Sequence, residues 1–218
     1  DNSSFGYLYS HTFDSNNSIN KVHRTNANGS VSTVTLNGLS PKAKITNLSN
    51  GNYAATWFSS DALYTQIFDS SGSSLSDVIQ LDNNIKFNFS HWGNWHSADK
   101  TLSIESSGSS GFNIALTTGV SNGNTYKNKC YRLTNSGDLI GSSIVDGNSW
   151  LDANNHLKIG NNATIFLGFK DLSSYGTSAL EGHIVFSDGT SRTIGLGSGA
   201  RYKPNITHNY DAATLSDG

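Results

Sequence analysis

The chain contains no methionine, one cysteine and two prolines among its 218 residues, and its other scarcities exclude whole classes of function. A single cysteine, Cys130, excludes an internal disulfide. Because Cys130 falls inside a strand pattern, we expect it to be buried. Charged residues make up 14% of the chain, against about 25% in an average soluble protein. With a net charge of −2, the chain does not carry the excess of positive charge that is typical of a nucleic-acid-binding protein. No apolar run reaches the ~18 residues that a membrane-spanning helix needs.

The chain opens at Asp1, which we interpret as the start of a processed or excised product. A cleaved secretory signal is one explanation. Seven Asn-x-Ser/Thr sequons would accept glycans in a eukaryotic secretory path. They begin at Asn2, Asn16, Asn28, Asn47, Asn88, Asn162 and Asn205. These features predict an extracellular protein, secreted or on the cell surface.

Serine, asparagine, threonine and 22 glycines take the place of the missing charges. Helical periodicity is nearly absent, whereas short runs that alternate between apolar and polar residues cover most of the chain. The clearest run is residues 52–57, and turn phrases such as Asp69-Ser70-Ser71-Gly72 separate the runs. This pattern predicts an all-β fold.

One strand-and-turn phrase recurs along the chain. Its anchors Phe13, Phe68, Leu133 and Phe186 are 55, 65 and 53 residues apart. Such a period indicates a repeat architecture.

The best-preserved unit spans residues 41–84. Its pattern predicts strands over 43–48, 53–57, 64–68 and 78–81. Four short antiparallel strands in about 40 residues is the size of one propeller blade. Two further units are predicted over 98–147 and 152–199, with an irregular insertion over 85–97.

The fourth unit is split between residues 1–40 and 200–218. Residues 210–218 match 43–51 and would supply a first strand and its turn, while residues 9–13 would supply the third strand. We therefore predict a single domain, a four-bladed β-propeller with one blade shared between the termini. A β-sandwich and an open β-repeat array are the alternatives, because the counterpart of one strand is missing or merged with residues 5–8. A strand donated by a neighbouring molecule is a further option.

The phrases at residues 45–53, 57–60 and 64–72 resemble tandem repeats in large secreted or surface proteins of bacteria and ciliates. Those repeats look like propeller blades or similar β modules and are common in adhesin-like proteins. The resemblance is good over about 40 residues and implies an extracellular β-repeat protein. It carries over no catalytic or ligand-binding residue.

The insertion holds the most unusual local cluster, formed by His91, Trp92, Asn94, Trp95 and His96. Flat aromatic faces beside amide and imidazole groups suit the mixed apolar and polar faces of a sugar. The alternative is that the two tryptophans fill the gap between blades. The spacing of the two histidines matches no standard zinc site, so we expect no metal and no cofactor.

No catalytic motif is recognisable. The chain has no nucleophile elbow, phosphate-binding glycine loop or dinucleotide fingerprint. Its two glutamates, Glu105 and Glu181, lie in no known motif, although a glycosidase pair would meet only in space. The turn aspartates, such as Asp69 and Asp188, are interpreted as turn caps, and Trp57 and Trp150 as core residues. The other two such aspartates are Asp14 and Asp217.

Three functional hypotheses follow. The first is a non-enzymatic, lectin-like binding or adhesion module, with a glycan or another cell-surface or matrix component as partner. The second is a structural subunit of an extracellular fibre or matrix that self-associates through its terminal strands. The third is a glycan-active hydrolase or lyase. We expect neither nucleic acid nor membrane insertion in any of them.

Overall fold

The computed structural model is all-β, as the alternation of residues predicts. It describes residues 9–13, 19–25, 29–37, 39, 43–83, 85, 88–91, 94–97, 102–119, 126–145, 149–159, 163–171, 177–186, 188 and 190–201. These residues form antiparallel strands and one short 3-10 turn, Gly108–Ser110. Within the same residues, no helix is long and apolar enough to cross a membrane.

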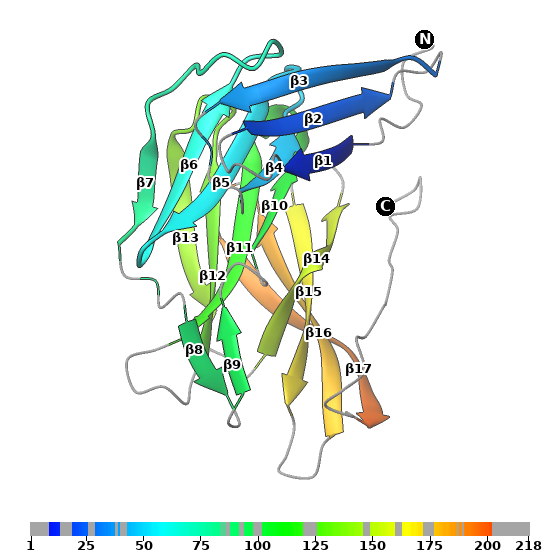
Figure 1. The fold of residues 1–218 in the computed structure, drawn as a ribbon. Helices are drawn as coiled ribbons and strands as arrows, with labels where there is room; N and C mark the ends of the chain where they lie inside the picture. Colours follow the sequence, from blue (N-terminus) through cyan, green and yellow to red (C-terminus); the bar gives the residue numbers. More distant parts are fainter. Residues whose placement is uncertain are drawn as a thin grey trace.

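Four sheets follow one another along the chain, and in each of them the strand order is the chain order (Figure 1). Sheet I contains β1 (Tyr9–Phe13), β2 (Ile19–Thr25) and β3 (Val31–Asn37). Sheet II contains β4 (Lys44–Asn47), β5 (Tyr53–Ser59), β6 (Ala62–Phe68) and β7 (Ile79–Asp82). Sheet III contains β10 (Ser103–Ser106), β11 (Phe112–Gly119), β12 (Tyr126–Leu133) and β13 (Leu139–Val145). Sheet IV contains β14 (Ser149–Ile159), β15 (Ala163–Asp171), β16 (Thr177–Phe186) and β17 (Ser191–Arg201).

The four strands of sheet II confirm the strands predicted for residues 43–81. Sheet III lies within the predicted unit 98–147, and sheet IV extends slightly beyond the predicted unit 152–199. A two-stranded hairpin, β8 (Asn88–His91) and β9 (Asn94–Ser97), lies in the predicted insertion.

The inner sheets of the stack are buried on both faces. Along β5, Tyr53, Ala55 and Trp57 pack against sheet I, whereas Ala54 and Phe58 pack toward sheet III. Successive residues of a strand point to opposite faces, so a strand between two sheets must be apolar at consecutive positions. This burial explains why residues 53–58 are a nearly continuous apolar run.

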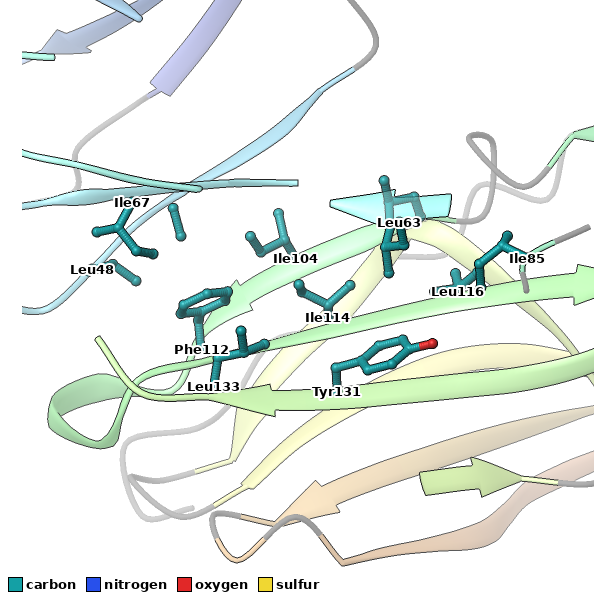
Figure 2. Packing of buried hydrophobic residues seen from close by; sticks show 12 residues of the cluster. Leu48, Leu63, Ile67, Ile85, Ile104, Phe112, Ile114, Leu116, Tyr131 and Leu133 are labelled. Atoms are coloured by element: carbon teal, nitrogen blue, oxygen red, sulfur yellow. The ribbon is translucent and has the colours of Figure 1, made fainter. Parts of the chain in front are cut away.

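The largest apolar cluster lies between sheets II and III (Figure 2). Leu63 and Ile67 of β6 face Phe112 and Ile114 of β11, and all four are almost completely buried. A smaller cluster joins Cys130 of sheet III to residues of sheet IV. The sheets therefore stack in chain order, I to IV, each packed on the next. The first strands of the last three sheets are neighbours, because β10 lies beside both β4 and β14.

A five-residue turn follows the third strand of sheets II, III and IV. It is closed by the backbone bonds Asp69 N to Ser73 O at 2.8 Å, Thr134 N to Asp138 O at 2.9 Å, and Phe186 N to Thr190 O at 2.8 Å. Asp69 and Thr134 directly follow the predicted anchors Phe68 and Leu133. Phe186 occupies the same place in its own turn, so the anchor of sheet IV is Val185.

The packing supports this one-residue correction of the repeat. Phe68 and Leu133 each face the preceding sheet, and Val185 does so as well, because it packs with Cys130 of sheet III. Phe186 packs on the opposite face of sheet IV. The alignment of Phe186 with Phe68 missed this one-residue shift, because the sequence alone does not say which face of the sheet a residue occupies.

The place of β1 also differs from the expectation. Residues 9–13 were expected to form the third strand of their unit, but β2 and β3 both follow before sheet II begins. Since the other sheets have four strands, β1 takes the second place and sheet I lacks a described first strand. The segments predicted to complete this unit, residues 5–8 and 210–218, lie outside the described residues. No described strand of sheet IV pairs with sheet I.

Candidate functional site

The predicted ligand-binding cluster lies mostly on the hairpin β8–β9. The backbones of β8 and β9 pair His91 with Asn94, Ser90 with Trp95 and Phe89 with His96. Trp92, which lies between β8 and β9 in the sequence, is outside the described residues. The hairpin lies against β11, near the end of sheet III that is remote from sheet I (Figure 1).

The register divides the predicted cluster between two faces of the hairpin. Residues opposite each other in an antiparallel pair share a face, and alternate residues change face. His91, Asn94 and His96 therefore belong to one face of the ribbon, and Trp95 belongs to the other. A ligand that contacts both sets would have to reach them around the turn end of the hairpin.

A second group of polar residues, which the sequence did not single out as a site, is buried between sheets III and IV. We call it the Arg132 cluster; it consists of Ser107, Asn113, Arg132 and Thr164, each at most 1% exposed. Arg132 Nη1 donates to Asn113 Oδ1 at 3.1 Å and also to Ser107 Oγ. Asn113 Nδ2 then donates to Thr164 Oγ1 of sheet IV at 2.7 Å. Burial lowers the pKa of the Arg132 guanidinium, because a low-dielectric surrounding disfavours its charge.

A chain of hydrogen bonds continues along the same interface. Thr117 Oγ1 donates to Asn128 Oδ1 at 2.8 Å, which orients the Asn128 amide so that its Nδ2 donates to His183 Nε2 at 3.4 Å. His183 Nδ1 lies 3.3 Å from Thr193 Oγ1. Because the Asn128 amide donates to Nε2, Nε2 is the acceptor, and we assign the ring N–H that faces Thr193 Oγ1 to Nδ1.

The Arg132 cluster breaks the rule that the other sheets follow. In sheets II, III and IV one cross-strand pair occupies the same place, on the face directed away from the preceding sheet: Ala54 with Ile67, Asn113 with Arg132, and Ile165 with Ile184. The pair is apolar in sheets II and IV and polar only in sheet III. The aligned phrases already contained this signal, because Arg132 stands where Ile67 stands, one residue before the anchor.

Complete burial decides what the Arg132 cluster can do. Its side chains make hydrogen bonds within the interface, and solvent does not reach them. A buried polar network of this kind fixes which partner surface fits, because a misplaced neighbour would leave polar atoms unsatisfied. We therefore assign it to the matching of sheets III and IV.

A half-buried ion pair joins sheets II and III. Lys129 Nζ lies 2.7 Å from Asp82 Oδ2, and Tyr131 Oη donates to the same oxygen at 2.6 Å. Burial, followed by the bond to Asp82, raises the pKa of Tyr131 well above its ordinary value. The three groups hold the edge strand β7 against β12.

The interpretation of Asp69 and Asp188 as turn caps is confirmed. Asp69 Oδ1 accepts from the Ser71 hydroxyl at 2.6 Å and from the backbone amides of Ser71 and Ser73. Asp188 Oδ1 accepts in the same way from Thr190. These bonds, the side-chain hydroxyl first, lower the pKa of each carboxyl group. Asp14 and Asp217 lie outside the described residues.

The remaining predicted residues are distributed as follows. Trp57 is a core residue, 8% exposed and stacked on Tyr64, as predicted. Cys130 is also buried as predicted, and burial raises the pKa of its thiol to about 12. Glu105 lies in β10 and Glu181 in β16. In the part of the chain that the structure describes, no three His, Cys, Asp or Glu residues come together as a metal site would require. Trp150 lies in β14, and its side chain is outside the description.

Of the seven sequons, two fall on described residues. Asn47 is half-buried at the end of β4, and Asn88 begins β8. The others, Asn2, Asn16, Asn28, Asn162 and Asn205, lie outside the described residues.

The chain matches no protein-family model and no curated protein sequence.

Proposed function

We propose that this protein is an extracellular, non-enzymatic binding module that holds a glycan at the hairpin β8–β9. The supporting observation is that this hairpin forms a separate two-stranded sheet in the connection between sheets II and III. The sheets repeat one packing plan, whereas the hairpin occurs in only one of the connections described. An element that the scaffold does not require is a natural place for a specific function.

The chemistry of the hairpin agrees with a sugar ligand. Imidazole and amide groups exchange hydrogen bonds with hydroxyl groups, and an indole ring stacks on the apolar face of a pyranose. Because the register places Trp95 on the face opposite His91 and Asn94, the proposed contact is the turn end, where Trp92 lies between them in sequence. The resemblance to adhesin-like repeats adds to this proposal.

We propose a propeller-like scaffold for this module, with sheets II, III and IV as blades and sheet I as a blade completed by the C-terminal segment. Three features support it. Sheets II, III and IV are four-stranded meanders, neighbouring sheets pack face to face, and the first strand β10 lies beside the first strands β4 and β14.

A glycan array tests the binding proposal. We expect the intact protein to bind a restricted set of glycans, and the Trp92→Ala/Trp95→Ala double variant to lose at least ~10-fold in affinity, since stacking residues dominate such sites. Leu75→Ala is the matched control, because Leu75 is an apolar side chain, 57% exposed, in the β6–β7 turn. An array without hits, or equal affinity of the double variant and the control, contradicts the proposal. Release of sugar products during incubation would favour the hydrolase or lyase instead.

A second function, a structural subunit of a fibre or matrix, is favoured by one observation. The outer edge of β1 has no described partner, and sheet I has one strand fewer than its neighbours. An open edge accepts a strand from another molecule. Light scattering at micromolar concentration discriminates: growing assemblies favour the fibre subunit, and a monomer contradicts it.

A further inference from the structure

We propose that the outer edges of sheets II and III form a binding surface for an extended peptide segment that carries apolar side chains together with lysine or arginine. Its centre is the turn-edge patch, which consists of Leu75, Val78, Leu139 and Ile140. This inference goes beyond glycan binding, because none of these residues belongs to the hairpin β8–β9.

The turn-edge patch is apolar and open to solvent. Leu75 and Val78 are 57% and 53% exposed, and Leu139 and Ile140 are 51% and 41% exposed. Together they present on the order of 300 Å² of apolar surface, the size at which a patch on a monomer is often functional. Among the side chains that the structure describes, Val31 of sheet I is the one other large apolar side chain that is exposed.

The two halves of the patch belong to neighbouring sheets that touch at this place. The turn before β13 lies on sheet II, because a Cβ on Gly137 would lie 2.7 Å from Ile79 Cδ1 and 3.3 Å from Ile67 Cγ1. Leu75 N donates to the backbone oxygen of Ile67 at 2.8 Å, and Leu139 begins β13 directly after this turn. The patch therefore runs across the boundary between the two sheets.

The repeat shows that the fold does not require apolar residues here. Leu75 and Ile140 occupy the same place in sheets II and III, one residue after the cross-strand partner of the anchor. In sheet IV this place is taken by Arg192, which is exposed. A charged residue therefore satisfies the fold at this position, and the apolar residues of sheets II and III are not explained by burial. Their recurrence beside each other favours a binding surface.

Negative charge beside the turn-edge patch indicates the chemistry of the partner. The segments that carry the patch, residues 69–83 and 134–145, contain four aspartates and no other charged residue. Two of these aspartates, Asp77 and Asp138, are exposed and directly precede residues of the patch. Because an acidic segment would be repelled, the complementary partner carries lysine or arginine beside its apolar residues.

The strand edges indicate that the partner is extended. β7 and β13 are the last strands of their sheets, and neither pairs with a further described strand on its outer side. The outward backbone N–H and C=O groups of such an edge can pair with an added strand. Alternate side chains of that strand would then meet the turn-edge patch.

A blocked peptide of about eight residues that alternates valine and lysine serves as the probe. Its binding to the full chain is measured by fluorescence anisotropy. We expect the Leu139→Ser/Ile140→Ser double variant to weaken binding at least ~10-fold, since central apolar contacts dominate such surfaces. Val31→Ser is the matched control and should leave the affinity unchanged, because Val31 is equally open to solvent but lies in sheet I, outside the patch.

The same assay tests the charges. Asp77→Asn is expected to weaken binding by ~2- to 5-fold at low salt. Asp61→Asn, which removes an exposed aspartate from the turn between β5 and β6, should leave the affinity unchanged. A matched peptide with glutamate in place of lysine is expected to bind at least ~10-fold more weakly.

The proposal is overturned by a lack of binding at millimolar peptide, by equal affinities of the serine double variant and its control or of the two asparagine variants, or by equal binding of the two peptides. Self-association in light scattering that the double variant abolishes also overturns it, because a second copy would then occupy the patch. If the double variant does not fold, NMR amide shifts of the unsubstituted chain decide. Shifts at residues 74–80 and 138–142 on peptide addition support the proposal, and their absence rejects it. Because no measurement uses a glycan, failure here is distinguishable from failure of the glycan-binding function.

Discussion

Arg132 and Asn113 are cross-strand partners whose side chains are hydrogen-bonded at 3.1 Å in the buried interface between sheets III and IV. The equivalent pairs of the neighbouring sheets are Ala54 with Ile67 and Ile165 with Ile184. The interface between sheets III and IV is therefore specified by hydrogen bonds at a place where the repeat otherwise uses apolar residues.

Replacing Arg132 alone should destabilise the protein, because its hydrogen-bond partner Asn113 stays buried. Arg132→Ile leaves Asn113 Oδ1 buried without its donor, which is expected to lower the free energy of unfolding by about 1–3 kcal/mol. The double variant Arg132→Ile/Asn113→Ala installs the residue types of sheet II. We expect it to lose less stability than the sum of the two single variants, with a coupling of about 0.5–3 kcal/mol. Urea unfolding of the four proteins measures this; strict additivity would show that the two residues do not act together.

Alanine variants of two turn glycines distinguish the cost of backbone strain from the cost of a steric clash. Gly51 and Gly72 have similar positive φ angles, 85° and 93°. A Cβ on Gly51 would meet nothing within 4 Å, whereas one on Gly72 would lie 2.2 Å from the backbone oxygen of Thr35 in sheet I. Gly51→Ala is expected to cost about 1–2 kcal/mol of stability. Gly72→Ala should cost a further ~1–3 kcal/mol, because the turn must move away from β3. Equal losses in thermal or urea unfolding would mean that the turn does not press on sheet I.

The Asp69 turn predicts a specific effect of acid. Because the folded pKa of Asp69 lies below its ordinary value of 3.8, its contribution to stability is present above that pH and is lost as the pH falls through the folded pKa. The Ser71 hydroxyl is the largest cause of the shift. In Ser71→Ala, the Asp69 pKa measured by NMR titration should therefore rise toward 3.8. Ser136→Ala, in the equivalent turn of sheet III, is the control; a change of the Asp69 pKa in that variant, or none in Ser71→Ala, would contradict the assignment.

The Cys130 thiol should not react with thiol reagents in the native protein. Its buried thiol, with a pKa raised to about 12, is almost entirely protonated at pH 8, and the thiolate is the reactive form. Native protein is expected to release no colour with a disulfide reagent, and urea-unfolded protein one equivalent. Rapid reaction of the native chain, or disulfide-linked dimers on storage, would place the thiol at the surface.

Much of the fold could be predicted from local patterns. Alternation of residues predicts strands, and the turn phrases locate their ends, so the strands of sheet II match the prediction to within two residues at each end. The errors arose where similar sequences occupy different faces of a sheet or different places in it. Phe186 looked like the anchor Phe68, yet Val185 makes the equivalent contact. Residues 9–13 likewise resembled a third strand, but β2 and β3 follow β1 within sheet I.

The candidate site could be predicted only in part. The unusual composition of residues 91–96 identifies the hairpin, because it interrupts the repeat. The division of Trp95 from His91 and His96 depends on strand register, which the sequence does not state. The Arg132 cluster escaped notice because an arginine in a strand suggests a surface position until its neighbours are known.

The sequence by itself determined the class of fold, the strand-and-turn repeat and the inertness expected of a lone cysteine in a strand, since these follow from local periodicity and residue chemistry. Tertiary structure alone decided that the sheets stack in chain order, that Arg132 and Asn113 lie between sheets III and IV, and that Ile165 and Ile184 line an apolar outer face of sheet IV. The physical reason is that burial and pairing across sheets join residues about 50 positions apart, such as Asn113 and Thr164, and no local pattern records which distant partner will satisfy them.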